Sequence, residues 1–97
     1  MKPVKFHPQA ESELAESAIF YNGRLPGLGD DFFAAVKLAG RQIQADLLRR
    51  PLRRDGTRKV TLPRFPYAVV YRDDPEQILI VAVAHGARRP GYWQYRL

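Results

Sequence analysis

Hydrophobic positions in the first half of the chain recur with the period of an α-helix. Between Gln9 and Arg24 the apolar residues lie three or four positions apart, at Ala10, Leu14, Ala18 and Tyr21, which is the spacing of one helix face. Pro8 suits the first turn of this helix, because its missing N–H has no intrahelical partner there. Three carboxylates lie early in the helix, where the helix dipole stabilises negative charge: Glu11, Glu13 and Glu16.

A second apolar stripe predicts a second helix after the helix-breaking residues 25–29. Its positions are Phe32 or Phe33, Val36, Gly40, Ile43 and Leu47. We expect Asp30 to cap this helix and Pro51 to end it, with Arg49 and Arg50 near its negative end. Because a glycine weakens a helix, we expect Gly40 to serve a close approach of the first helix. Residues 8–50 are therefore predicted to form an antiparallel helix hairpin.

The second half of the chain changes to the two-residue period of β-strands. Residues 59–62 predict a short strand, and residues 66–72 alternate Tyr67, Val69 and Tyr71 with Ala68, Val70 and Arg72. Residues 78–84 are apolar at every position, as in a strand covered on both faces. Residues 4–7 predict another short strand, residues 73–76 are typical of a turn, and residues 85–97 favour a loop or a short final strand.

The order of these elements predicts a two-layer α+β fold, because the helix hairpin must bury its apolar stripe on one face of a sheet. The expected arrangement is an N-terminal strand, an antiparallel helix hairpin and a three-stranded antiparallel sheet. A length of 97 residues fits one domain over residues 1–97.

Composition narrows the possible chemistry. There is no cysteine, so disulfides and thiolate metal sites are excluded, and two histidines alone argue against a structural zinc site. We therefore expect no metal and no cofactor. The longest apolar run, residues 78–84, is far shorter than the roughly 20 residues of a membrane span. With a polar start and no targeting segment, we expect a cytoplasmic protein without membrane contact.

The positive charge is concentrated in one stretch. The formal net charge is +6, and residues 41–64 hold eight Lys/Arg against two Asp/Glu, which is also +6. The flanking segments cancel each other. A local excess of this kind indicates a basic surface for a polyanionic or acidic partner, although a solvated face that aids solubility has the same signature.

Several motifs together resemble the RelE/ParE superfamily of type II toxin–antitoxin toxins. The matching segments, in chain order, are VKFHPQAESEL, FYN, LPGLGDDFF, RRPLRRDGTRKVTL, RFPYAVVYR and ILIVAVAHGARRPGYWQYR. The ordered set is specific, above all FPYAVVYR followed by AVAHGARRPGYW. The resemblance implies a bacterial toxin that binds a cognate antitoxin. We expect the antitoxin to be acidic and the two proteins to form a hetero-oligomer.

Two different activities occur on this fold, and the resemblance alone does not decide between them. ParE-like members inhibit DNA gyrase by binding it, whereas RelE-like members cut mRNA in the ribosome. The end of the chain, RRPGYWQYRL, is closer to ParE-like relatives, so gyrase inhibition is the favoured hypothesis. The alternative is a ribosome-dependent mRNA endoribonuclease that needs no metal.

An endoribonuclease would need groups that move protons and groups that hold phosphorane charge. The candidates for these roles are His85, Arg88, Arg89 and Tyr92. An imidazole group can take up or release a proton near neutral pH, but a histidine at a strand end, such as His85, can equally be a structural residue hydrogen-bonded to backbone.

A target-binding surface is expected from the basic stretch and the C-terminal segment. Its candidate residues are Arg53, Arg54, Arg58, Lys59, Arg64, Arg88, Arg89 and Tyr95. Arginines there can hold phosphate or carboxylate, and tyrosines can stack on bases. Trp93 is expected to close the core near the terminus instead. The central prediction is that the basic stretch and the C-terminal segment meet on one surface.

Overall fold

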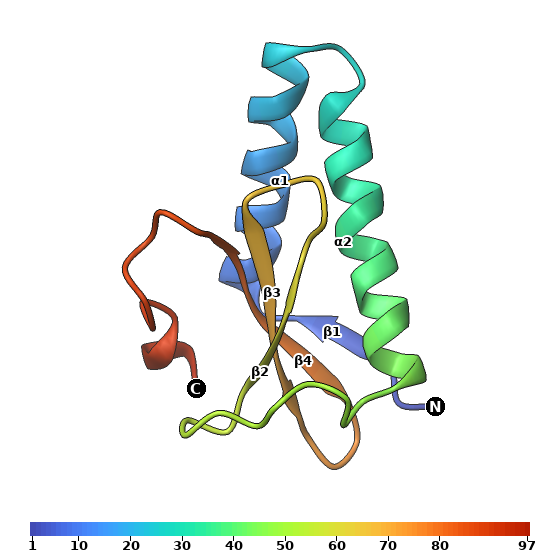
Figure 1. The fold of residues 1–97 in the computed structure, drawn as a ribbon, viewed down its shortest axis with the longest axis vertical. Helices are drawn as coiled ribbons and strands as arrows, with labels where there is room; N and C mark the ends of the chain where they lie inside the picture. The colour runs from blue at the N-terminus through green and yellow to red at the C-terminus, as the bar shows by residue number, and fades with distance from the viewer.

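The computed structural model describes all 97 residues, and it confirms the predicted α+β fold (Figure 1). Two helices form a hairpin and four strands form one sheet. In chain order the elements are β1 (Val4–Phe6), α1 (Pro8–Arg24), α2 (Leu28–Ala45), β2 (Arg58–Thr61), β3 (Tyr67–Asp73), β4 (Ile78–His85) and a final 3₁₀ turn (Gln94–Arg96).

The sheet has the strand order β1-β4-β3-β2. Strands β2, β3 and β4 pair antiparallel, as expected, and β1 adds a fourth strand that lies parallel to β4 at the edge. The pairing between β3 and β4 is irregular at one point. Val70 pairs with Ala82 and the next residue, Tyr71, pairs with Ile80, so Val81 has no partner on β3. Val81 is therefore the extra residue of a β-bulge.

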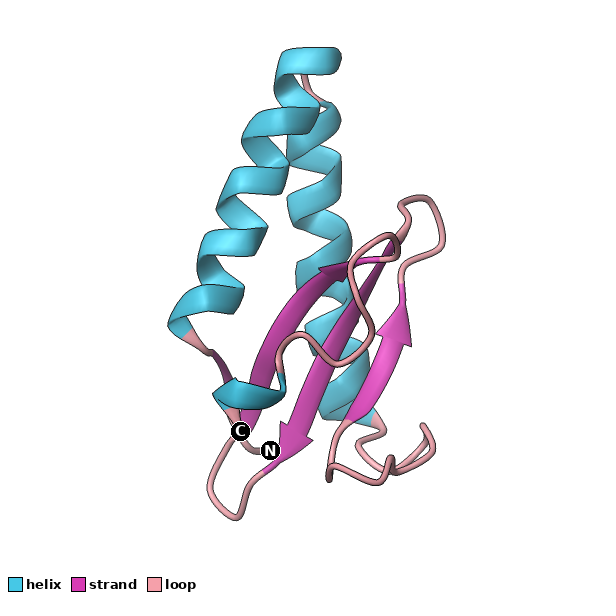
Figure 2. Ribbon diagram, turned by 90° about the vertical axis from the view of Figure 1, so that its left-hand side faces the viewer, coloured by secondary structure: helices cyan, strands magenta, loops and turns pink.

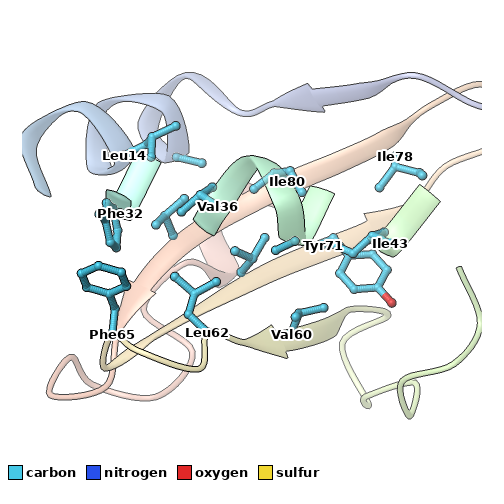
Figure 3. Close-up of a cluster of buried hydrophobic side chains, with 14 residues drawn as sticks. Leu14, Phe32, Val36, Ile43, Val60, Leu62, Phe65, Tyr71, Ile78 and Ile80 are labelled. Atoms are coloured by element: carbon cyan, nitrogen blue, oxygen red, sulfur yellow. The ribbon is translucent and has the colours of Figure 1, made fainter. Parts of the chain in front are cut away.

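The sheet carries cores of unequal size on its two faces. The helices cover one face, where a cluster of 14 buried residues includes Leu14, Phe32, Val36, Ile43 and Ile80 (Figure 3). The C-terminal segment crosses the other face, in front of the sheet in Figure 2 while α2 lies behind it. There, Trp93 is 6% exposed and packs with residues of β3 and β4 in a five-residue cluster. This confirms that Trp93 closes the core and that β4 is covered on both faces.

The second helix is shorter than predicted, and both of its ends differ from the expectation. It starts after Gly27, so Asp30 lies inside the first turn and is not the cap. It stops at Ala45, so Arg49 and Arg50 lie in an irregular segment outside the last turn. The cause is tertiary: the Tyr71 hydroxyl donates to the Leu47 carbonyl at 3.1 Å and Arg58 Nε donates to the Arg50 carbonyl at 2.9 Å. These side chains satisfy carbonyls of the segment that leaves the helix.

The glycine that brings the two helices together is Gly29, and the expectation for Gly40 was wrong. A Cβ at Gly29 would overlap the backbone carbonyl of Ala18 on α1. A Cβ at Gly40 would meet only Val4 of β1, at 3.9 Å, because that part of α2 lies over the sheet edge. No helix of the protein has the length and apolar character needed to cross a membrane.

Candidate target-binding face

The face of the sheet away from the helices carries a cavity of about 150 Å³ lined by cations. We call it the basic cavity. Its charged lining is Arg53, Lys59 and Arg88, its apolar lining includes Ala68, Val70 and Ala84, and His85 and Trp93 also contribute. The basic stretch and the C-terminal segment therefore meet at one place, as the sequence predicted.

Lys59 reaches this face because side chains alternate along a strand. Lys59 pairs with Val70 and Val60 pairs with Val69. Val60 and Val69 belong to the core under the helices, whereas Val70 belongs to the cluster around Trp93. The exposed Lys59 is consequently directed to the face that the C-terminal segment crosses.

Arg53 is placed by a tight turn that contacts the C-terminal segment. Its N–H donates to the Thr57 carbonyl at 2.8 Å, and Asp55 Oδ1 accepts from both the N–H and the hydroxyl of Thr57, at 3.0 and 2.6 Å. Burial alone would raise the pKa of Asp55, but hydrogen bonds from Thr57 and Gln94 and the charge of Arg53 together lower it. The turn and the C-terminal segment share the lining of the basic cavity, through Arg53 on one side and Arg88 and Trp93 on the other.

The C-terminal segment is held in place by Glu13, which receives hydrogen bonds from three residues. Arg96 donates to both carboxylate oxygens, at 3.0 and 2.9 Å. The Tyr92 hydroxyl donates at 2.7 Å and the Val83 N–H at 3.0 Å. Arg96 also donates to the Val81 carbonyl at 3.0 Å. Glu13 and Arg96 thereby satisfy backbone groups of β4 at the bulge.

The Glu13 cluster raises the pKa of Tyr92 and of Arg96. Burial first, and then the hydrogen bond to Glu13, raise the pKa of Tyr92. The hydrogen bond to Glu13 raises the pKa of Arg96 most strongly. Sequence reasoning assigned Glu13 to the helix dipole and did not select Arg96, because nothing local signals a pair that is 83 residues apart.

The nuclease candidates are largely occupied by interactions within the protein. His85 Nδ1 accepts from the Ala87 N–H at 2.9 Å, and its ring meets Tyr67 edge-on with centroids 5.0 Å apart. This is the structural role considered for a strand-end histidine. The Tyr92 hydroxyl is bound to Glu13, and the Arg88 guanidinium lies 3.9 Å from the centre of the Tyr92 ring. Arg89 is exposed and lies outside the basic cavity.

The remaining target-binding candidates do not line the basic cavity. Arg58 pairs with Tyr71 on the helix side and donates to the Arg50 carbonyl. Arg64 lies between β2 and β3, with its guanidinium 3.7 Å from an Asp31 carboxylate oxygen and stacked near Phe65. Arg54 and Tyr95 are exposed, and Tyr95 is 69% exposed. The three cations of the cavity are thus a subset of the predicted surface.

A second hollow lies on the helix side, between α2 and the outer edge of β2. It has a volume of about 290 Å³ and an apolar lining of Ala35, Leu38, Ala39, Val60 and Leu62. We call it the α2–β2 groove. Leu38 is 48% exposed at its rim, and β2 has no strand on its outer side.

No three His, Asp or Glu side chains gather where they could hold a metal ion. What the basic cavity offers a ligand is therefore positive charge and hydrogen-bond donors. Guanidinium and ammonium groups have no acceptor lone pairs, so the cavity suits an anion.

Comparisons with known proteins agree with this description. The family model described as "ParE toxin of type II toxin-antitoxin system, parDE" matches residues 4–90. A solved structure of the chromosomal ParDE TA system from P. aeruginosa matches with a TM-score of 0.76 and 20% sequence identity, covering 88% of this chain and 96% of that chain. No curated protein sequence matches significantly. At this identity, the structural match supports the fold.

Proposed function

The chain belongs to the ParE toxin family of type II toxin–antitoxin systems, and on that premise we propose that it inhibits DNA gyrase by binding it. The observation that supports binding over catalysis is the state of the candidate acid–base groups. The Tyr92 hydroxyl is bound to Glu13 and His85 Nδ1 is bound to backbone. A protein that cuts RNA must release and accept protons, and these hydrogen bonds leave only His85 Nε2 for such a role.

Inhibition is tested with purified toxin and gyrase in a DNA supercoiling assay. We expect excess toxin to stop supercoiling and antitoxin to restore it. A Lys59→Gln variant should inhibit less, because it removes a cation of the basic cavity. Full supercoiling at a large excess of well-folded toxin would refute the gyrase target.

The ribosome-dependent endoribonuclease remains the second candidate, because His85, Lys59 and Arg88 line the same cavity. If His85 Nε2 moves a proton there, Arg88 and Lys59 would hold the phosphate charge. Primer extension on ribosome-bound mRNA separates the two activities. Cuts that disappear in a His85→Ala variant would support the nuclease, whereas uncut message with the parent toxin would exclude it.

We further propose that an acidic antitoxin segment covers the α2–β2 groove. The groove is apolar, with Leu38 exposed at its rim, and Arg50 also lines it. The unpaired outer edge of β2 could accept an extended segment by main-chain hydrogen bonding, and the net charge of +6 favours an acidic partner. Both proteins would then act in the cytoplasm, where gyrase works on DNA.

Co-purification with the antitoxin tests this docking site. A Leu38→Asp variant should lose at least about tenfold in affinity, because an unpaired carboxylate would be buried in an apolar contact. The matched control is Ile19→Asp, which places the same charge on the exposed surface of α1. Equal retention of both variants would show that the antitoxin docks elsewhere.

A further inference from the structure

We propose that the basic cavity is a phosphate site that holds a backbone phosphate of DNA through Arg53, Lys59 and Arg88. The proposal deepens the proposed function and rests on it only in naming DNA as the source of the phosphate. The cations come from three separate segments: the turn before β2, β2 itself and the C-terminal segment. Their convergence is a property of the folded chain.

None of the three cations has a carboxylate partner. The ion pairs of the protein involve Lys2, Arg64, Arg72 and Arg96, and no Asp or Glu lines the cavity. Asp55, whose charge reaches Arg53, is already hydrogen-bonded to Thr57. Three unpaired positive charges around about 150 Å³ create a positive potential that an anion relieves.

The hollow itself follows from small side chains on neighbouring strands. Ala68 of β3 is directly opposite Ala84 of β4, and both line the cavity. Larger residues at this pair would fill the space between the strands and the C-terminal segment. The alanines therefore leave room for a small group beneath the cations.

One residue of the lining has a buried hydrogen-bond donor without an acceptor. Trp93 lines the cavity, and its Nε1–H is buried with no acceptor within the protein. Buried donors in folded proteins nearly always have a partner. The unpaired Nε1–H is therefore an unusual feature of a residue that lines the cavity.

The surroundings favour the phosphate of a polymer over a carboxylate of a protein. Arg54 and Arg89 follow Arg53 and Arg88 in sequence and are exposed, so they add positive charge near the residues of the cavity. DNA carries a regular row of negative charges that a basic surface attracts. The acidic antitoxin segment has its own proposed groove on the opposite side of the sheet, between α2 and β2.

The test uses the fluorescence of Trp93, the only tryptophan in the chain. The full-length toxin is titrated with a short DNA duplex, with inorganic phosphate and with polyglutamate, at several salt concentrations. We expect DNA to change the Trp93 emission and to bind more tightly than polyglutamate of equal charge. Affinity should fall with salt, because phosphate contacts release counterions.

Matched lysine variants distinguish a defined phosphate site from general electrostatic attraction between the toxin and DNA. Lys59→Gln should weaken DNA binding about tenfold and lower the slope of log affinity against log salt by about 1. Lys5→Gln removes the same charge from another exposed strand position and should change affinity less than about threefold. Arg53→Gln and Arg24→Gln, the latter at the exposed end of α1, form a second pair with the same expected contrast, and circular dichroism checks that all four variants fold.

Three results would overturn the proposal. Equal losses for Lys59→Gln and Lys5→Gln would show diffuse attraction without a site. Tighter binding of polyglutamate would assign the cavity to an acidic protein, and saturation by inorganic phosphate without any DNA binding would assign it to a free anion. DNA binding without inhibition of supercoiling would leave this site standing and refute the gyrase target, so the two proposals fail independently.

Discussion

At the scale of single residues, Glu13 is the side chain on which the C-terminal segment depends. It pairs with Arg96, whose side chain is only 4% exposed. We expect Glu13→Gln to lower the free energy of unfolding by about 3 kcal/mol, because breaking a buried pair leaves an uncompensated charge. Urea denaturation measures the change, with Glu16→Gln on the exposed surface of α1 as the control. If both variants unfold at the same urea concentration, the pair carries no stability.

A second residue-scale prediction concerns the contact between the two helices. A Cβ at Gly29 would overlap the Ala18 carbonyl, whereas a Cβ at Gly23 would have nothing within 4 Å. Gly29→Ala should therefore destabilise the protein by roughly 1–3 kcal/mol through overpacking, and Gly23→Ala should stabilise it by up to about 1 kcal/mol. Thermal unfolding of the two variants decides this, and a Gly29→Ala variant as stable as the parent would contradict the close contact.

At the scale of elements, the turn over residues 53–57 should make stability depend on acid pH. The folded-state pKa of Asp55 is lowered from 3.8, so its contribution is present above pH 3.8 and is lost as the pH falls through the folded pKa. The difference in unfolding free energy between the parent and Asp55→Ala should shrink below about pH 3.8. A difference that is constant from pH 7 to pH 2 would show that the carboxylate is not the stabilising group.

The elements also show how much of the fold the local sequence pattern predicts. Both helices and the strands were predictable, because apolar positions repeat with the period of each element. The end of α2 was not, since Tyr71 and Arg58 bind carbonyls of the segment that follows it. The basic cavity was foreseen as a meeting of two segments. The structure was needed to show which of the predicted residues line the cavity, namely Arg53, Lys59 and Arg88. Side chains alternate between the two faces of a strand, so Lys59 and Arg58 point to opposite sides of the sheet.

At the scale of the whole molecule, the two proposed binding surfaces lie on opposite sides of the sheet. The α2–β2 groove is on the helix side, and the basic cavity is under the C-terminal segment, and Figure 2 shows α2 and the C-terminal segment on opposite sides of the sheet. A toxin built in this way can be bound by its antitoxin at one face while it presents cations at the other. Neutralisation would then follow from the bulk of the antitoxin or from its acidic charge.

This separation predicts that the two activities can be lost independently. Lys59→Gln should reduce inhibition of supercoiling while antitoxin still co-purifies with the variant, because Lys59 lies outside the groove. Leu38→Asp should lose antitoxin while the free variant still inhibits gyrase, because Leu38 lies outside the cavity. Both variants are scored for both readouts in parallel. Joint loss of the two activities in either variant, with the fold intact, would mean that antitoxin and target compete for one surface.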